Sequence, residues 1–200
     1  MTVHTEKLGG RLPLLDPLTL SVAQKEIYDR MNRTFVSWSD RIHFQSKIDD
    51  GRLIGPLNPI LFSPSISSSF LDLHDAEEKH TSLHERVRQV VILAVGAVWK
   101  SDYELYAHSA AARKAGLSEN AIRTLTTGGL PDDLSGEEKV AQRYARQFSA
   151  EHRVDAALYR SAVDAFGAQG VVDLTYLIGI YHITCGLLNS FEVPAPDETG

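Results

Sequence analysis

The sequence is poor in sulfur. Of its 200 residues, one is cysteine and two are methionine. The single cysteine, Cys185, excludes an internal disulfide framework and any Cys-x-x-Cys redox pair. A chain of this length buries roughly 70% of its unfolded surface on folding, so an ordinary hydrophobic core can hold it together.

The sequence also lacks a basic run and a long hydrophobic run. It has 20 Lys and Arg against 26 Asp and Glu, a net charge of −6, so we expect no nucleic acid partner. The longest apolar stretch, residues 90–99, falls short of the about 20 residues that span a bilayer. The first residues lack the apolar region of a secretory signal. These absences predict a cytoplasmic protein that does not enter a membrane.

Helical periodicity dominates what is present. Apolar residues recur every three or four positions over 19–38, and over 83–99 they cover most of the helix circumference, which predicts a buried helix. Gly, Pro and Ser residues mark the ends of the other predicted helices, at 64–73, 101–116, 118–128, 135–148, 155–166 and 170–191. The acidic stretch 75–79 is expected to be a solvated connection. No alternating strand pattern occurs, so the predicted fold class is all-α, a helix bundle.

One segment carries a pattern suited to chemistry. Ser101, Glu104 and His108 lie at i, i+3 and i+7 and therefore share a helix face. A carboxylate one turn from an imidazole is expected to raise its pKa and fix its tautomer, which suits general acid catalysis near neutral pH. Aromatic residues nearby are candidates for excluding water and positioning a flat substrate: Trp99, Tyr103 and Tyr106.

Structural interpretations compete with this one. Ser101-x-x-Glu104 is also a capping box, in which Glu104 folds back on the helix N-terminus. His182 lies in an apolar segment, where it is either a neutral histidine hydrogen-bonded in the core or a second pocket residue facing His108. His80 and His84 have the i, i+4 spacing of metal ligands, but the His-Glu-x-x-His order of zinc hydrolases is absent, so we predict a solvated, charged helix start and no metal site.

The segment 88–116, together with the stretch SDYELYAHSAAARKAGLS (residues 101–118) that begins in its second half, resembles the signature of the carboxymuconolactone decarboxylase family. That family shares its helical fold with alkylhydroperoxidase D-like proteins. Residues 55–58 and 189–194 resemble its flanking segments. The resemblance implies a helical domain over 51–196 and an N-terminal arm and helix extension over 1–50, which would be able to cap a partner subunit's pocket.

Departures from the family pattern are informative. Peroxidase-type members carry paired cysteines where this chain has Ser101 and Glu104, so thiol peroxidase activity is disfavoured. Many members carry a glutamate where this chain has Gln89. Glutamine forms hydrogen bonds but does not exchange a proton, and Glu85, one turn earlier, is a candidate substitute.

The resemblance implies a decarboxylase acting on 4-carboxymuconolactone or a related small carboxylic acid or lactone, in the catabolism of aromatic compounds. The substrate's unsaturated lactone accepts the electrons of the broken bond, so no cofactor is expected. His108 would be the general acid, Glu104 its orienting partner, and Arg52 the cation that holds substrate carboxylates.

Two alternatives remain: a non-catalytic helical oligomer or binding module, and a hydrolase or isomerase acting on a similar acid. The nearly all-apolar helices 83–99 and 171–191 also predict a homo-oligomer, because one small chain offers them limited cover.

Overall fold

A computed structural model describes residues 7–196, and these residues are helical throughout the core. The helices are α2 (Val22–Met31), the π-helix η1 (Asn32–Val36), α3 (Ser37–Ile42), α4 (Leu57–Leu61), α5 (Pro64–His80), α6 (Glu85–Trp99), α7 (Asp102–Lys114), α8 (Glu119–Thr126), α9 (Gly136–Glu151) and α10 (Ala156–Ser190). Within 7–196 the only β-type pairing is an isolated bridge between Lys47 and Leu53. The all-α prediction is confirmed.

Local sequence signals set several helix ends. Ser135 begins α9 with a capping box, accepting from the Glu138 backbone N–H while its own backbone N–H donates to the Glu138 side chain. Gly167 interrupts α10 with φ 67° and ψ 175°, so the segment is two helices joined at a kink.

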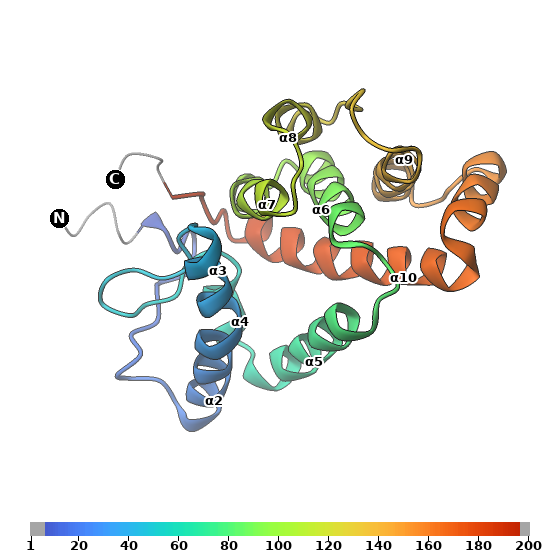
Figure 1. The fold of residues 1–200 in the computed structure, drawn as a ribbon. Coiled ribbons are helices and arrows are strands. Elements are labelled where there is room, and N and C mark those ends of the chain that lie inside the picture. The colour runs from blue at the N-terminus through green and yellow to red at the C-terminus, as the bar shows by residue number, and fades with distance from the viewer. Residues whose placement is uncertain (1–6, 197–200) are drawn as a thin grey trace.

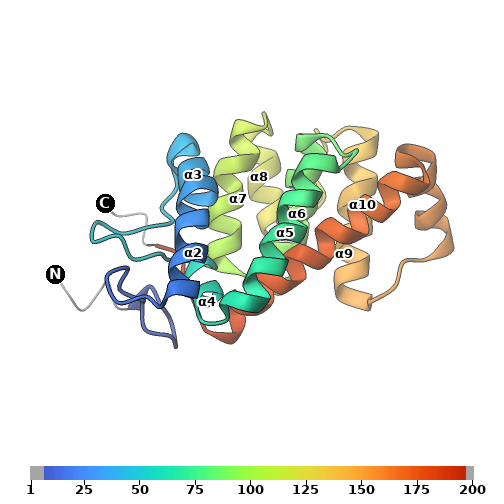
Figure 2. The same cartoon turned by 90° about the horizontal axis from the view of Figure 1, so that it is seen from below.

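Helix α6 is the centre of the molecule. It packs against α7, α8, α9 and α10, and every side chain from Val87 to Val95 is buried. Figure 1 shows α10 running across the middle, with α6–α9 on one side and α2, α4 and α5 on the other. The view in Figure 2 shows the same arrangement along a second direction, with α5 crossing over α10.

Residues 7–50 pack into the rest of the chain. Leu14, Phe44 and Ile48 share a hydrophobic cluster with residues of α7 and the C-terminal segment. Ile27, Met31 and Val36 form another with α4 and α5. The N-terminal extension is thereby fixed against the helices that follow it.

Helix α5 is longer than the sequence indicates. The expected solvated connection at 75–79 is wrong: these residues continue α5 to His80, and Glu77 is buried. The cause is tertiary, because the Arg88 guanidinium of α6 donates to Glu77 Oε2 at 2.6 Å and so compensates the buried charge. His80 ends α5 and His84 precedes α6, and no metal-binding cluster of three or more candidate ligands occurs among the described residues.

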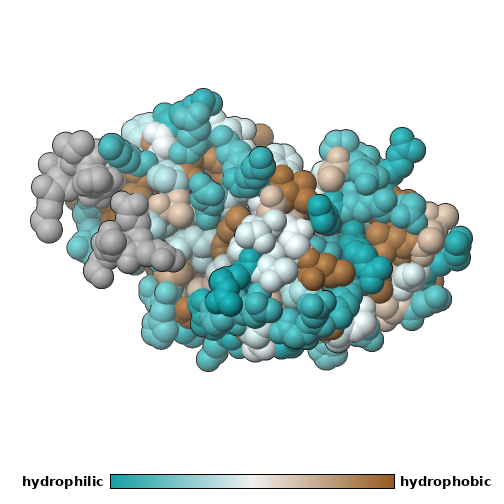
Figure 3. Space-filling view, turned by 90° about the horizontal axis from the view of Figure 1, so that it is seen from above, coloured by the Kyte–Doolittle hydropathy of each residue, from teal (hydrophilic) through white to brown (hydrophobic). Residues whose placement is uncertain are grey.

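By length and composition alone, helix α10 is long and apolar enough to cross a membrane. The sequence does not indicate this through its longest uninterrupted apolar stretch, residues 90–99. Half of its most apolar window is buried against the protein, as in the core helix of a soluble fold, so this is weak evidence for a span. The face of the molecule in Figure 3 is largely hydrophilic, with apolar residues in small patches.

Candidate active site

A cavity of about 510 Å³ lies between the N-terminal helices, α5 and the core helices α6, α7 and α10. About half of the residues that line it are aromatic or aliphatic, and the other half are polar or charged. One wall comes from η1 and α3, which supply Arg33, Thr34, Phe35, Trp38 and Arg41. Irregular π-helical turns often occur at functional sites. The N-terminal extension therefore covers this chain's own pocket.

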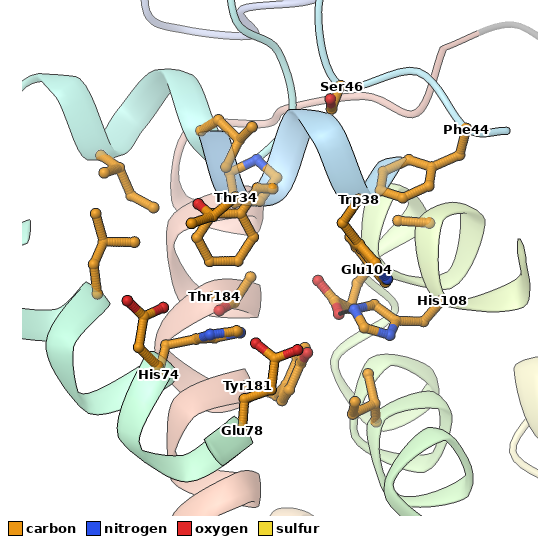
Figure 4. A pocket seen from close by; sticks show the side chains of 18 of the residues that line it. Thr34, Trp38, Phe44, Ser46, His74, Glu78, Glu104, His108, Tyr181 and Thr184 are labelled. Carbon is orange, nitrogen blue, oxygen red and sulfur yellow. Dashed lines mark ion pairs between the residues drawn. The ribbon is translucent and has the colours of Figure 1, made fainter. Parts of the chain in front are cut away.

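The predicted pair is present in the cavity wall. Glu104 and His108, one turn apart on α7, are 3% and 7% exposed, and Glu104 Oε1 lies 3.1 Å from His108 Nε2. Figure 4 shows the Glu104 carboxyl group projecting into the cavity beside His108. Among the described residues Oε1 has no other partner, and Oε2 has none and is open to the cavity.

Two residues of α6, Glu85 and Gln89, orient the His108 ring through a chain of hydrogen bonds. Gln89 Nε2 donates to Glu85 Oε1 at 2.7 Å, because a carboxylate only accepts. Gln89 Oε1 then faces His108 Nδ1 at 2.9 Å, and an amide oxygen also only accepts. His108 Nδ1 therefore carries a hydrogen, and in the neutral ring Nε2 is the acceptor that faces Glu104 Oε1.

Burial reverses the expected charges of the pair. It raises the pKa of Glu104 from 4.5 to about 8 and lowers the pKa of His108 from 6.5 to about 3, with the electrostatic influence of His74 and Arg88 adding to the second effect. The prediction of a raised pKa for His108 is wrong, because desolvation outweighs the carboxylate. Between about pH 3 and about pH 8 the pair holds one shared proton, with Glu104 as the protonated partner.

The capping alternative is not what the structure shows. Ser101 is the N-cap residue of α7, but its side chain makes no capping hydrogen bond, and Glu104 turns to His108 instead. Ser101 is buried outside the cavity lining.

Tyr103 and Tyr106 fix the segment 43–46 through hydrogen bonds to the backbone of Gln45. Tyr103, which also lines the cavity, donates to the Gln45 carbonyl at 2.7 Å, and the Gln45 N–H donates to the Tyr106 hydroxyl at 2.9 Å. A Cβ at Gly55 would lie 2.1 Å from the Tyr103 ring, so only glycine fits there. Tyr106 does not line this cavity, and its predicted substrate contact is replaced by support of the 43–46 segment.

The remaining predicted residues lie elsewhere. Trp99 and His182 pack against each other with ring centroids 5.6 Å apart, and neither lines the cavity. His182 Nε2 is 2.8 Å from Ser149 Oγ, so it is the hydrogen-bonded histidine of the first interpretation and does not face His108. Arg52 pairs with Asp50 outside the cavity. The arginines that line the cavity are Arg33, Arg41 and Arg88.

Several site residues are not evident from the sequence. The Trp38 and Tyr181 rings lie 5.7 Å and 5.0 Å from the His108 ring, and His74 lines the cavity from α5. Trp38 lies at the end of the predicted amphipathic stretch 19–38, and Tyr181 immediately precedes His182. The sequence around Trp38 or Tyr181 does not indicate that either side chain contacts His108 of α7.

Comparison with known proteins supports the family resemblance. Residues 64–147 match the model of the carboxymuconolactone decarboxylase family. A search of curated protein sequences gave no match.

Solved structures share the fold at low sequence identity. An uncharacterized peroxidase-related protein from Ralstonia eutropha JMP134, described as an alkylhydroperoxidase AhpD core, has a TM-score of 0.75 at 17% identity, covering 95% of this chain and 94% of its own. One from Silicibacter sp. TM1040 has a TM-score of 0.72 at 14% identity, covering 95% and 93%. A cysteine-to-alanine variant of the debrominase Bmp8, in complex with 2,3,4-tribromopyrrole, has a TM-score of 0.69 at 12% identity, covering 94% of each chain.

Proposed function

We propose that the protein is a cofactor-free decarboxylase, because residues 64–147 match the model of the carboxymuconolactone decarboxylase family. Its substrate would be 4-carboxymuconolactone or a related small ring acid. Glu104 would deliver the proton that replaces the lost carboxylate.

One observation carries this proposal: a carboxylic acid that keeps its proton at neutral pH, placed in the wall of a cavity that is lined in part by aromatic side chains. Its pKa of about 8 lies near the operating range, where a general acid is most effective. The cavity volume of about 510 Å³ suits a small molecule.

The reaction can be balanced with these groups alone. The bond between the ring carbon and the substrate carboxylate breaks, carbon dioxide leaves, and the electron pair passes into the unsaturated lactone. The Glu104 carboxyl group turns its protonated oxygen from His108 Nε2 toward the carbanionic ring carbon, which takes the proton and leaves Glu104 as a carboxylate. Water restores that proton, since Gln89 does not relay one to Glu85.

The roles of the pair are the opposite of those predicted from the sequence. Both His108 nitrogens are occupied, one by Gln89 and the other by Glu104. Glu104 Oε2 is not held by His108, so rotation of the carboxyl group can present the protonated oxygen to a substrate. Glu104 is therefore assigned as the acid, and His108 as the acceptor that holds its proton before reaction.

A thiol mechanism is not proposed. Cys185 is buried, and that burial raises the pKa of its thiol well above the usual range. The debrominase of similar fold binds a small planar ring, which supports a flat cyclic substrate here. The all-helical fold, typical of soluble proteins, supports a cytoplasmic enzyme.

The test is release of carbon dioxide from 4-carboxymuconolactone. Glu104→Gln and His108→Ala should each lower kcat by about 10²–10³, a typical cost of removing a proton-transfer group. His80→Ala, which changes an exposed histidine at the end of α5, should leave kcat unchanged. Turnover that survives Glu104→Gln, or no release by the unaltered protein, would overturn the proposal.

A further inference from the structure

We propose that His74 forms a second anchoring point in the cavity, which holds a carboxylate arm of the substrate while Glu104 meets its ring. This inference rests on the proposed function and narrows its substrate class. It points to a planar lactone ring that bears an acceptor group on the side away from the proton donor.

The position of His74 supports this role. His74 lies on α5 and lines the cavity, with its ring edge-on to Phe35 at a centroid distance of 4.8 Å. Figure 4 shows its imidazole pointing into the cavity on the side opposite Glu104 and His108, with Tyr181 and Thr184 between them. The two polar groups therefore face one space from different helices.

The two His74 nitrogens differ in access. Nδ1 is buried and has no hydrogen-bond partner. Nε2 also has none among residues 7–196, but it is not enclosed and so opens to the cavity. In the neutral ring the proton favours Nε2, where water or a ligand can accept it, because a buried N–H without an acceptor is costly. His74 thus presents an Nε2–H donor to the cavity.

The charges around His74 are paired with one another, so the neutral ring acts on a ligand as a hydrogen-bond donor and favours an accepting group. Burial lowers the pKa of His74 from 6.5 to about 4; Asp75 opposes this, whereas the nearby Arg88 and Arg30 add to it. Each guanidinium is itself paired with two carboxylates, Arg30 with Asp72 and Asp75 and Arg88 with Glu77 and Glu85. Of the carboxylates that line this side, Asp75 is paired with Arg30 at 2.7 Å and Glu78 is exposed.

Within residues 7–196 the fold gives the His74 imidazole a ring contact but no hydrogen bond. A buried nitrogen without a partner destabilises the folded state, and such groups in a native structure usually mark a functional role. A phenylalanine at this position would keep the contact with Phe35 and remove the unpartnered nitrogen. Ligand binding and stability should therefore respond to His74→Phe in opposite directions.

Calorimetric binding of two stable probes tests the inference without any turnover. Muconolactone carries a lactone ring and a carboxylate arm, whereas 2(5H)-furanone carries the ring alone. His74→Phe should weaken muconolactone binding by about tenfold, the value of one hydrogen bond to a charged acceptor. It should leave furanone binding unchanged, and the melting temperature should stay equal or rise. His80→Phe on the same helix is the matched control and should alter neither affinity.

Equal muconolactone affinity in the His74→Phe variant and the unaltered protein would overturn the inference, as would equal weakening for both probes. So would failure of muconolactone to bind the unaltered protein at millimolar concentration. Because binding is measured without catalysis, absence of carbon dioxide release combined with His74-dependent binding would contradict the decarboxylase and leave the anchoring site standing.

Discussion

At the residue scale, burial controls the proton shared by Glu104 and His108. Both side chains are almost completely removed from water, and each is held toward its uncharged form. The raised pKa of Glu104 means that its proton is present below about pH 8 and lost above it. We predict that kcat falls as the pH rises through this value, in a pH–rate profile measured with saturating substrate.

Glu85 is predicted to act on this proton through Gln89. Its carboxylate fixes the amide so that Gln89 Oε1 accepts from His108 Nδ1. In Glu85→Gln the amide is free to turn and donate to Nδ1, which moves the imidazole proton to Nε2 and favours the ionised form of Glu104. The alkaline limb of the pH–rate profile should move to lower pH and kcat at neutral pH should fall by up to about tenfold.

The control for this change is Glu26→Gln, which removes an exposed carboxylate on α2. An alkaline limb that stays in place in Glu85→Gln would show that Glu85 has no positioning role, even if the rate falls.

The sequence predicts the contact between Glu104 and His108 but not its chemistry. The contact is predictable because residues spaced by one helical turn lie next to each other on the helix surface. The degree of burial depends on Trp38 from α3 and Tyr181 from α10, which pack around the His108 ring from far along the chain. For this reason the predicted direction of the pKa shift is wrong, and the sequence does not identify His74 as a cavity residue.

At the element scale, glycines and capping residues determine where the helices end. Gly167 divides α10 with φ and ψ values open almost only to glycine, and no atom lies within 4 Å of the position that a Cβ would take there. Gly167→Ala should therefore lower the free energy of unfolding by about 1–3 kcal/mol through backbone strain alone. Thermal denaturation followed by circular dichroism measures this effect.

Gly136→Ala is the matched control, because Gly136 also has open space around it but lies in the first turn of α9 with a negative φ. Alanine should be neutral or stabilising there. Equal melting temperatures for both variants would show that the kink at Gly167 stores no conformational strain.

Helix ends that depend on local signals are predictable, and those that depend on distant partners are not. The Ser135 capping box and the Gly167 break are evident in the sequence. The last two turns of α5 are not, because Glu77 looks like a solvent-exposed acid until Arg88 of α6 is placed beside it. The same ion pair turns a predicted connection into part of the cavity wall.

At the scale of the whole molecule, the chain covers one of its two most apolar helices but not the other. Helix α6 is enclosed by α7–α10, so it needs no partner subunit. Helix α10 leaves Val172, Tyr176 and Ile183 between 48% and 56% exposed. Their spacing places them along one face, and a contiguous apolar face of this kind favours self-association.

We predict a homo-oligomer that uses this face of α10. Tyr176→Glu should lower the mass measured by light scattering after size-exclusion chromatography, with the helical circular dichroism spectrum retained. Ile66→Glu, which alters an exposed apolar residue on α5, should leave the mass unchanged. A monomeric unaltered protein, or a mass that Tyr176→Glu does not change, would contradict the assignment of this face.

The protonation state of Glu104 is the claim on which the proposed chemistry depends. Its most direct measurement is a pH titration of the side-chain carboxyl carbons by NMR in protein labelled with ¹³C at glutamate. We predict one resonance with a midpoint of about pH 8 that is absent from Glu104→Gln. If every glutamate resonance titrates near the ordinary value of 4.5, Glu104 is ionised at neutral pH and cannot be the proton donor.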